Sequence, residues 1–313
     1  MGEMNVVLGA GGGAGSAVVR QLVAQSKPVR AVNRSGEGRW PDSVESVRAD
    51  VSDPAAARVA CAGAAVVYHC VNVPYPKWTP VLPGVMDSVI AAAESADATL
   101  VYCDNLYAYG PADAPLTERS PLRAEGAKGR LRNQLADRLL GAHAGGHVRA
   151  VIGRGSDFFG PGATNTVAGQ LVFPKVVEDE KARWLGSLDQ PHSQNYVDDF
   201  ARGLIVLGES PRALGEVWHI PPNGSPTGRE FIEMAFAAAG REARIGVYPR
   251  WMMRFAALLS RDMREILEVL HQFENPFVLD GSKFTDTFGD LELTPMREAV
   301  ARTVEWFREE SGS

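Results

Sequence analysis

Residues 6–15 read Val6-Val7-Leu8-Gly9-Ala10-Gly11-Gly12-Gly13-Ala14-Gly15. The apolar run 4–8 predicts a buried strand, and residues 16–23 space their apolar side chains as a helix does. Glycines between a strand and a helix let the backbone turn tightly and let an anion approach it, while the helix N-terminus offers free N–H donors. The stretch therefore predicts the phosphate-binding turn of a dinucleotide site, with an ordinary strand-to-helix turn as the alternative.

The composition of the 313-residue chain is that of a globular protein, with 45% hydrophobic and 22% charged residues. A formal net charge of −6 and the lack of a basic run argue against a nucleic-acid surface. Apolar stretches end before the roughly 20 residues of a membrane span, so no membrane partner is expected. No signal-peptide pattern precedes the first strand, which predicts a cytoplasmic location. The three cysteines lack metal-ligand spacing, so we expect reduced thiols and no metal site.

Strand and helix patterns alternate through the first half of the chain. Such βαβ repetition with nearly continuous apolar strands predicts an α/β fold with a doubly wound parallel Rossmann sheet, covered by helices on both faces. Ligands are then expected at the carboxyl ends of the strands. The expected strands span residues 4–8, 28–33, 46–50, 65–70, 99–103 and 147–152, and the expected later helices span 54–61, 83–96 and 127–142.

The pattern changes after residue 153, where glycine, proline and aromatic residues crowd 155–161. We expect a small, interleaved C-terminal cap that binds substrate. Residues 1–155 are predicted to form an NADP-binding Rossmann domain, its sheet completed by segments near 195–220, and residues 156–313 mainly the cap and C-terminal helices. Further strands are expected at 171–177 and 217–220, and further helices at 197–208, 228–239, 250–273 and 295–309.

The end of the second strand favours NADP(H) over NAD(H). An NAD site usually places Asp or Glu there to hold the ribose diol, but this chain has Asn33, followed by Arg34 and Ser35. No carboxylate repels a 2′-phosphate, and Arg34 can bind one in a fork geometry, unless it is only a solvated turn residue. The expected cofactor-binding residues are Gly9, Gly11, Gly12, Gly13, Ala14, Gly15, Asn33, Arg34, Ser35, Asp50, Val51, Cys70, Val71, Asn72 and Phe158.

Four segments, in order, resemble the extended-type short-chain dehydrogenases/reductases of the NAD(P)-dependent epimerase/dehydratase kind. The glycine loop has that family's spacing, Gly9-x-x-Gly12-x-x-Gly15, although it also fits the general G-x-G-x-x-A form. Residues 107–111 resemble the family's "VYG" segment, residues 154–162 its "RPxxxYGPG" segment, and residues 192–201 its "xxVxDxA" segment. The resemblance covers nearly the whole chain and implies a nicotinamide cofactor, a small-molecule substrate and a homodimer.

The residues that the resemblance implies for catalysis are not those of the family. Members use Ser or Thr, Tyr and Lys, with Tyr-x-x-x-Lys on one helix face. Here the Ser position falls on Asn105, the Tyr position on Lys128 and the Lys position on Arg132, and no tyrosine occurs between residues 110 and 195. The pattern resembles an atypical subgroup with a degenerate tetrad. Candidate catalytic residues are Asn105, Tyr107, Lys128 and Arg132; Lys128 is alternatively a solvated first-turn lysine, and Asp104 a turn cap.

The function stays open between three classes. The first is an NADP(H)-dependent oxidoreductase acting on a small, ring-bearing molecule. The second is an epimerase, lyase or isomerase that retains its nucleotide, and the third a non-enzymatic NADP-binding redox sensor. Aromatic residues between the strand ends and the cap suit an apolar or ring-bearing substrate. The expected substrate-lining residues are Tyr75, Trp78, Phe159, His192 and Gln194.

Overall fold

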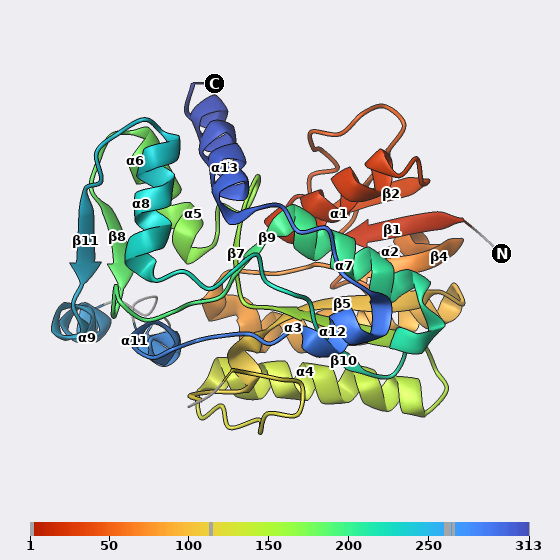
Figure 1. The fold of residues 1–313 in the computed structure, drawn as a ribbon. Helices are drawn as coiled ribbons and strands as arrows, with labels where there is room; N and C mark the ends of the chain where they lie inside the picture. The colour runs from red at the N-terminus through yellow and green to blue at the C-terminus, as the bar shows by residue number, and fades with distance from the viewer. Residues whose placement is uncertain (1–2, 113–114, 260–263, 265–266, 313) are drawn as a thin grey trace.

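The computed structural model describes residues 3–112, 115–259, 264 and 267–312 (Figure 1). Its centre is a parallel sheet in the order β10-β6-β5-β4-β1-β2-β3. This confirms the predicted α/β class and the doubly wound Rossmann sheet. The strands are β1 (Met4–Leu8), β2 (Val29–Asn33), β3 (Glu45–Arg48), β4 (Ala64–His69), β5 (Thr99–Asn105), β6 (Arg149–Gly155) and β10 (Val217–His219).

Helices cover both faces of the sheet, because its central strands carry apolar side chains on both sides. One face packs on α2 (Pro54–Cys61), α3 (Trp78–Ser95) and α4 (Ala127–Ala144). The other packs on α1 (Gly13–Ala24), α7 (Val197–Glu209) and α12 (Ser282–Phe288). Two turns of 3₁₀ helix, η1 (Tyr75–Lys77) and η2 (Leu106–Ala108), follow β4 and β5, and η3 (Pro211–Ala213) precedes β10.

The strand order reverses between β1 and β4. The chain builds β1, β2 and β3 toward one edge and then β4, β5, β6 and β10 toward the other. In such sheets a ligand binds in the crevice outside the carboxyl ends of the strands at the reversal. The loops after β1, β2, β3, β4 and β5 therefore share one edge of the sheet.

The second half of the chain forms a cap at that edge, on the left of Figure 1. Its core gathers Phe159, Phe173, Trp184, Phe231 and Phe307. Two small parallel sheets pair β7 (Asp157–Phe159) with β9 (Gln194–Tyr196) and β8 (Ala182–Leu185) with β11 (Ile245–Tyr248). The cap helices are α5 (Val167–Leu171), α6 (Phe173–Val177), α8 (Gly228–Ala238), α9 (Arg250–Leu259), α11 (His271–Glu274) and α13 (Met296–Ser311).

Two predicted elements differ in kind from the structure, and the helix expected at 83–96 begins earlier, at Trp78 of α3, with Pro83 inside it. The strand expected at 171–177 is wrong, because this segment forms the end of α5 and all of α6, where Pro174 occupies a first-turn position that needs no N–H. The helix expected over 250–273 is interrupted by a turn at Leu270, and its residues 260–263 and 265–266 lie outside the described residues.

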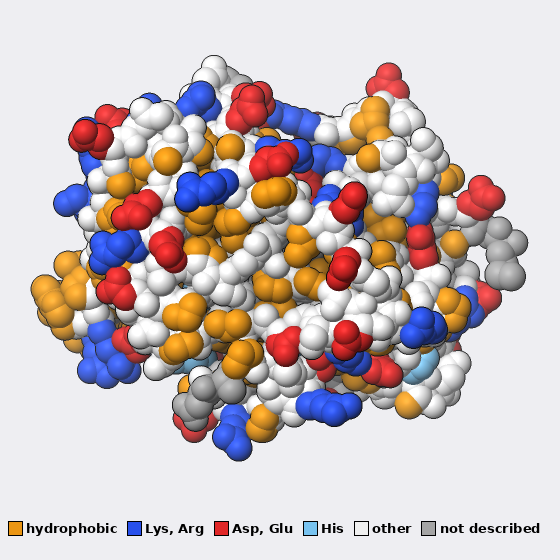
Figure 2. Space-filling model, viewed as in Figure 1, with side chains coloured by type: hydrophobic (Ala, Val, Ile, Leu, Met, Phe, Trp, Pro, Cys, Tyr) orange, Lys and Arg blue, Asp and Glu red, His pale blue; other side chains and the backbone are white. Residues whose placement is uncertain are grey.

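Exposed hydrophobic side chains gather on α9. Trp251, Phe255 and Leu258 lie on one face of this helix and are 70%, 65% and 78% exposed. Figure 2 shows the resulting hydrophobic area at the left edge of the molecule. None of the described helices combines the length and the apolar content that crossing a membrane requires.

Candidate functional site

The glycine loop packs its backbone against itself and against β4. Gly9 has a φ of +82°, and a Cβ there would lie 2.7 Å from the carbonyl oxygen of Cys70. A Cβ on Gly15 would lie 2.2 Å from the carbonyl oxygen of Gly9. Side chains at these two positions would collide with backbone, so glycine is required by the closeness of β1, α1 and the end of β4.

The opposite side of the loop is open. Gly12 is the N-cap of α1 and has no side chain that could hydrogen-bond to the first turn. A Cβ built on Gly12 would have one heavy atom within 4 Å, the carbonyl oxygen of Gly9 at 3.6 Å. The first turn of α1 contains no acidic residue. The N–H groups there have no acceptor within the helix, and the helix dipole favours an anion. This cradle fits a pyrophosphate, as the loop sequence predicts.

The loop after β2 is closed by Asn33. Its Oδ1 accepts hydrogen bonds from the Gly36 N–H at 2.6 Å and the Ser35 hydroxyl at 3.0 Å, and its Nδ2 donates to the Glu37 carbonyl at 2.7 Å. Arg34 and Ser35 lie exposed beyond this turn. Asn33 therefore shapes the loop, while the guanidinium of Arg34 is presented to solvent at the edge of the cradle.

Asp50 lies beside this loop, after β3. Hydrogen bonds from the Ser52 hydroxyl and N–H lower the pKa of Asp50, and the positive charge of Arg34 contributes further. Of the other predicted cofactor residues, Cys70 contacts the loop backbone, and Phe158 on β7 packs edge-on against Phe200 at 4.8 Å. Topology places these residues, with Val51, Val71 and Asn72, around the same carboxyl edge.

A buried ionic cluster lies under the end of β5. Asp104 stands between two guanidinium groups: Arg154 Nε donates to Oδ2 at 2.8 Å, and Arg132 Nη1 lies 3.4 Å from Oδ1. All three side chains are buried. Asp104 is therefore the counterion of both arginines, which corrects its expected role as a turn cap. With two cations and one anion, the cluster keeps an excess positive charge.

Arg132 also joins the aromatic group beside the sheet edge. Its Nη1 donates to the Tyr102 hydroxyl at 2.6 Å, and its guanidinium lies 4.1 Å from the ring centroid of Trp78. Trp78 is buried and donates its indole N–H to the Val73 carbonyl. Arg132 on α4 is therefore a buried residue that lies beside the end of β5.

The hydroxyls of Tyr75 and Tyr107 lie 2.7 Å apart. Burial raises the pKa of Tyr75 to about 12 and raises that of Tyr107 well above its usual value. Asn105, at the family's Ser position, accepts a hydrogen bond from the Tyr107 N–H at 3.1 Å and so caps η2. Both phenols are therefore protonated near neutral pH and can act as hydrogen-bond donors.

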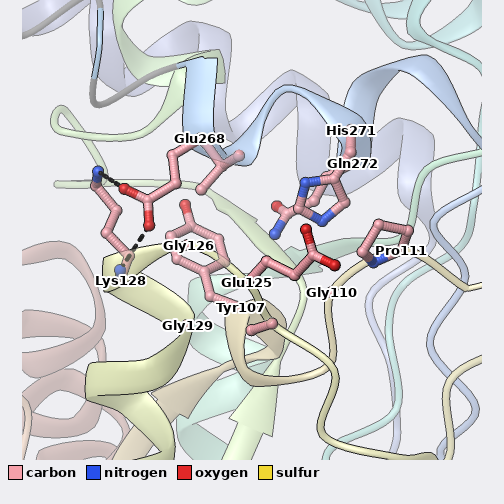
Figure 3. Close-up of a pocket in the computed structure, with 12 residues that line it drawn as sticks. Tyr107, Gly110, Pro111, Glu125, Gly126, Lys128, Gly129, Glu268, His271 and Gln272 are labelled. Atoms are coloured by element: carbon pink, nitrogen blue, oxygen red, sulfur yellow. Dashed lines mark hydrogen bonds and ion pairs between the residues drawn. The ribbon is translucent and has the colours of Figure 1, made fainter.

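Lys128, at the family's Tyr position, is buried and held by Glu268 from the C-terminal part of the chain. Its N–H donates to Glu268 Oε1 at 2.8 Å, and its Nζ lies 3.2 Å from Oε2 (Figure 3). Nζ also lies 4.9 Å from the ring centroid of Tyr75. The solvated alternative for Lys128 is wrong. Glu268 is the counterion of Lys128 in this buried position.

A cavity of about 140 Å³ lies beside Lys128 and Tyr107. Residues from η2, the loop before α4, the start of α4 and the turn before α11 surround it (Figure 3). Sequence reasoning missed the residues from the turn before α11 and from α11 itself, since no motif marks them. The first of them, Glu268, follows Lys128 by 140 positions in the chain. The lining residues are Tyr107, Gly110, Pro111, Ala124, Glu125, Gly126, Lys128, Gly129, Glu268, Val269, His271 and Gln272.

Three predicted substrate residues pack inside the cap instead of lining this cavity. Phe159 is fully buried against Phe173 and Phe231. His192 bonds Asp157 through Nε2 at 2.8 Å and the Gln272 carbonyl through Nδ1 at 3.0 Å. Gln194 is buried on β9. Phe159 and Gln194 lie on the paired strands β7 and β9, and the ring of His192 packs against Trp184, Phe273 and Phe277. Within the described ranges, no three His, Cys, Asp or Glu side chains are grouped to hold a metal.

Residues 5–220 match the NAD dependent epimerase/dehydratase family. The chain belongs to this family. The uncharacterized protein y4nL of Sinorhizobium fredii (strain NBRC 101917 / NGR234) is 24% identical over 316 residues, which cover 93% of this chain and 86% of y4nL. The match extends beyond the family segment into the cap.

Solved structures of the same fold superpose along the whole chain. A double mutant of DesIV, the dTDP-glucose 4,6-dehydratase from Streptomyces venezuelae with NAD and DAU bound, has a TM-score of 0.80 at 18% identity over 99% of this chain and 98% of that chain. UDP-glucuronic acid 4-epimerase from Bacillus cereus in complex with NAD has a TM-score of 0.80 at 16% identity over 98% and 96%. These likenesses establish the fold.

Proposed function

We propose that the protein is an NADP(H)-dependent oxidoreductase of the short-chain dehydrogenase/reductase type, acting on a small, ring-bearing molecule through a non-standard active site. The observation that carries this proposal is the pairing of an open glycine cradle at α1 with a cavity at Lys128 and Tyr107 on the same sheet edge. Family membership and solved neighbours that hold NAD support a nicotinamide dinucleotide in the cradle.

The first turn of α1 would hold the pyrophosphate, and Arg34 the 2′-phosphate of NADP(H). When bound, the cofactor supplies a hydride donor or acceptor. NADP(H) is proposed over NAD(H) because β2 ends without a carboxylate and Arg34 is exposed at the cradle edge. The negative charge of Asp50 also attracts Arg34, so Asp50 competes with a 2′-phosphate for this arginine and weakens the preference for NADP(H).

The residues near the cavity are proposed to bind the substrate oxygen, to supply positive charge and to position Tyr107. Tyr107 and Lys128 can donate hydrogen bonds to a substrate oxygen, because a phenol carries an O–H donor and a lysine side chain carries N–H donors. Arg132 contributes positive charge from beneath, held in place by Asp104, Tyr102 and Trp78. Asn105 sets the start of η2 and so places Tyr107. We propose these four as the catalytic group that replaces Ser, Tyr and Lys.

A second candidate is an epimerase, lyase or isomerase that keeps its nucleotide. It is favoured by the solved neighbours described as a dehydratase and an epimerase with NAD bound. A third, a redox sensor without turnover, is favoured by the absence of the family's tyrosine between residues 110 and 195. In each case we propose a cytoplasmic homodimer whose contact uses α3 and α4.

Nucleotide titration followed by turnover separates these candidates. Tryptophan fluorescence should report NADP⁺ and NADPH binding, and NADPH should be oxidised with a panel of cyclic ketones. Nucleotide retained through purification and regenerated after substrate addition would instead favour the second candidate, and binding without any turnover the third. Failure of both NADP(H) and NAD(H) to bind at millimolar concentration would overturn all three.

The Arg34→Ala variant tests the choice of nucleotide. It should weaken NADP(H) at least tenfold and leave NAD(H) nearly unchanged, because a charge-assisted contact to the 2′-phosphate is lost. Arg39→Ala is the matched control, since Arg39 is an exposed arginine in the same loop. Equal losses for both nucleotides, or an equal effect of the control, would contradict the assignment.

A further inference from the structure

Most of the large hydrophobic side chains exposed within the described part of the chain lie on α9, which carries four of six. These four are Trp251, Met252, Phe255 and Leu258, and they define the outer face of α9. Figure 2 shows the hydrophobic area that they form at the left edge of the molecule. Single exposed hydrophobic residues are ordinary, but a contiguous group of them marks a contact surface. The outer face of α9 is such a group.

The opposite face of α9 holds the helix on the cap. Met253 and Ala257, four residues apart and therefore on one side of the helix, are 1% and 5% exposed. Met253 belongs to the same hydrophobic core as Trp184 and Phe231. The side chains of the outer face are thus presented by a helix that is already packed, and they are free to meet something beyond this chain.

Positive charge accompanies the outer face. Residues 250–259 contain two arginines and no acidic residue, although the whole chain has a formal net charge of −6. Arg250 and Arg254 are exposed and four residues apart, so they flank the outer face on one side. Arg250 pairs with Glu274 at 3.2 Å, and Arg264, further along the chain, is also exposed. The balance of these groups is positive, which favours an anionic occupant.

The size of the outer face argues against a second copy of the chain as its occupant. Phe and Trp side chains present roughly 150–250 Å² each, so at the exposures found here the whole face offers on the order of 400 Å². A specific interface between proteins buries about 800 Å² on each partner. A bilayer sets no such minimum, because an amphipathic helix inserts its aromatic and leucine side chains about 5–10 Å into the headgroup region.

We propose that the outer face of α9 docks the protein on the surface of a bilayer that carries anionic headgroups. Trp251, Phe255 and Leu258 enter the headgroup region, while the guanidinium groups of Arg250 and Arg254 stay beside the headgroups and their aliphatic stems cover apolar surface.

The described helix has 10 residues, half of what a membrane span requires, so it lies on the bilayer and does not cross it. The lack of a spanning segment, from which the sequence predicts no membrane partner, leaves such surface contact open. This inference depends on neither the proposed nucleotide nor the proposed reaction.

Co-sedimentation of the full chain with vesicles, without nucleotide, tests the proposal. One set of vesicles contains equal parts of phosphatidylcholine and phosphatidylserine, and the other contains phosphatidylcholine alone. The protein should bind the first set at least tenfold more tightly, because each arginine near an anionic surface is attracted to it, and added salt should weaken this binding. Equal binding to both sets, or binding to neither, would overturn the proposal.

Trp251 reports which surface meets the vesicle. It is exposed, whereas the other five tryptophans are buried or half-buried. Transfer of its indole from water into the headgroup region should move the fluorescence emission to shorter wavelength when phosphatidylserine vesicles are added. Trp251→Tyr should still bind, because tyrosine also suits the membrane interface, but should lose this shift. Binding without any shift in the wild-type protein would place the contact elsewhere and overturn the proposal.

Two variants separate the hydrophobic and the electrostatic contributions. Phe255→Glu should weaken binding to phosphatidylserine vesicles at least tenfold, since it puts a carboxylate into the outer face. Val59→Glu is the matched control, because Val59 is an exposed hydrophobic residue on α2, away from this face. Arg254→Glu should also weaken binding to these vesicles at least tenfold. All three side chains are exposed, so the melting temperatures should stay close to that of the wild type.

The same variants expose the competing occupant. Equal vesicle binding by Phe255→Glu and Val59→Glu would overturn the proposal. If Phe255→Glu, without vesicles, halves the mass measured by light scattering while Val59→Glu does not, the outer face of α9 is an interface between copies of the chain, and the membrane proposal is overturned in favour of that interface.

Discussion

At the scale of single residues, Gly12 and Gly15 share one loop but differ in the space around them. Ala at position 15 would place Cβ 2.2 Å from the Gly9 carbonyl oxygen, whereas Ala at position 12 would meet nothing closer than 3.6 Å. We expect Gly15→Ala to lower the free energy of unfolding by about 1–3 kcal/mol, as overpacking does. Urea denaturation monitored by circular dichroism measures this loss.

Gly12→Ala should leave stability nearly unchanged and weaken NADP⁺ binding at least tenfold, because its methyl group stands on the open side of the cradle. Fluorescence titration checks the affinity, and Gly15→Ala serves as the contrasting variant for stability. Unchanged NADP⁺ affinity in Gly12→Ala would show that no pyrophosphate approaches the loop from this side.

Asp104 is the counterion of two buried arginines, so its charge is expected to matter more than its size. Asp104→Asn should destabilise the protein by about 3–5 kcal/mol, because Arg132 and Arg154 lose their shared carboxylate. Asp97→Asn is the matched control, since Asp97 pairs with Arg149 at the surface and its loss should have little effect. Similar urea midpoints for both variants would contradict the importance of the cluster.

Residues near one another in a motif were predictable, and residues brought together by the fold were not. The loop from Gly9 to Gly15 and the turn from Asn33 to Ser35 were placed correctly because short spacing defines their geometry. The family pattern singled out Lys128 and Arg132, but it did not identify Glu268 and Asp104 as their ion-pair partners. Glu268 in particular depends on how the cap returns to α4, which no local pattern encodes.

At the scale of elements, the short edge strand β10 depends on His219. Its Nε2 lies 2.7 Å from the Tyr109 hydroxyl, and its Nδ1 faces the carbonyls of Leu116 and Asp280. Burial, aided by the charge of Arg154, lowers the pKa of His219 to about 4. In the unfolded chain the pKa of histidine is about 6.5.

Between these two values the unfolded chain binds more protons than the native one, so stability falls as the pH drops from about 6.5 to about 4. Above 6.5 the contribution of His219 is fully present, and below 4 its loss is complete. His219→Gln should flatten this part of the stability profile, whereas His147→Gln, at the surface, should not. Urea midpoints at pH 7, 5.5 and 4.5 measure the difference, and parallel profiles for wild type and His219→Gln would contradict it.

The central strands of the main sheet were predictable because they are short apolar runs flanked by turn residues, whereas the edge strand β3 (Glu45–Arg48) has only one apolar residue. The same signal failed at residues 171–177, since a short apolar run also suits a fully buried helix turn. The prediction for 217–220 was confirmed as β10, although its neighbour β6 precedes it by some sixty residues. Local pattern identifies a buried segment, and the partner that buries it is decided by the whole chain.

At the scale of the whole molecule, the cap and the sheet are interleaved. After the cap begins, the chain returns to the sheet for α7 and β10, goes back to the cap for α8, and returns again for α12. Figure 1 shows these later segments crossing between the two parts. Because Glu268 and Gln272 approach Lys128 from one such segment, the cavity exists only when both parts are folded and joined.

The outer faces of α3 and α4 are where we expect two copies to meet. The two helices lie side by side, and exposed small residues on them, Gly84 and Gly141, have no heavy atom within 4 Å of a Cβ built there. Small residues permit close helix packing between copies. The protein should therefore have twice the mass of one chain in light scattering. Ala91→Arg, on the exposed face of α3, should convert it to a monomer, whereas Glu233→Arg on α8 should not. A dimer that survives Ala91→Arg would place the contact elsewhere.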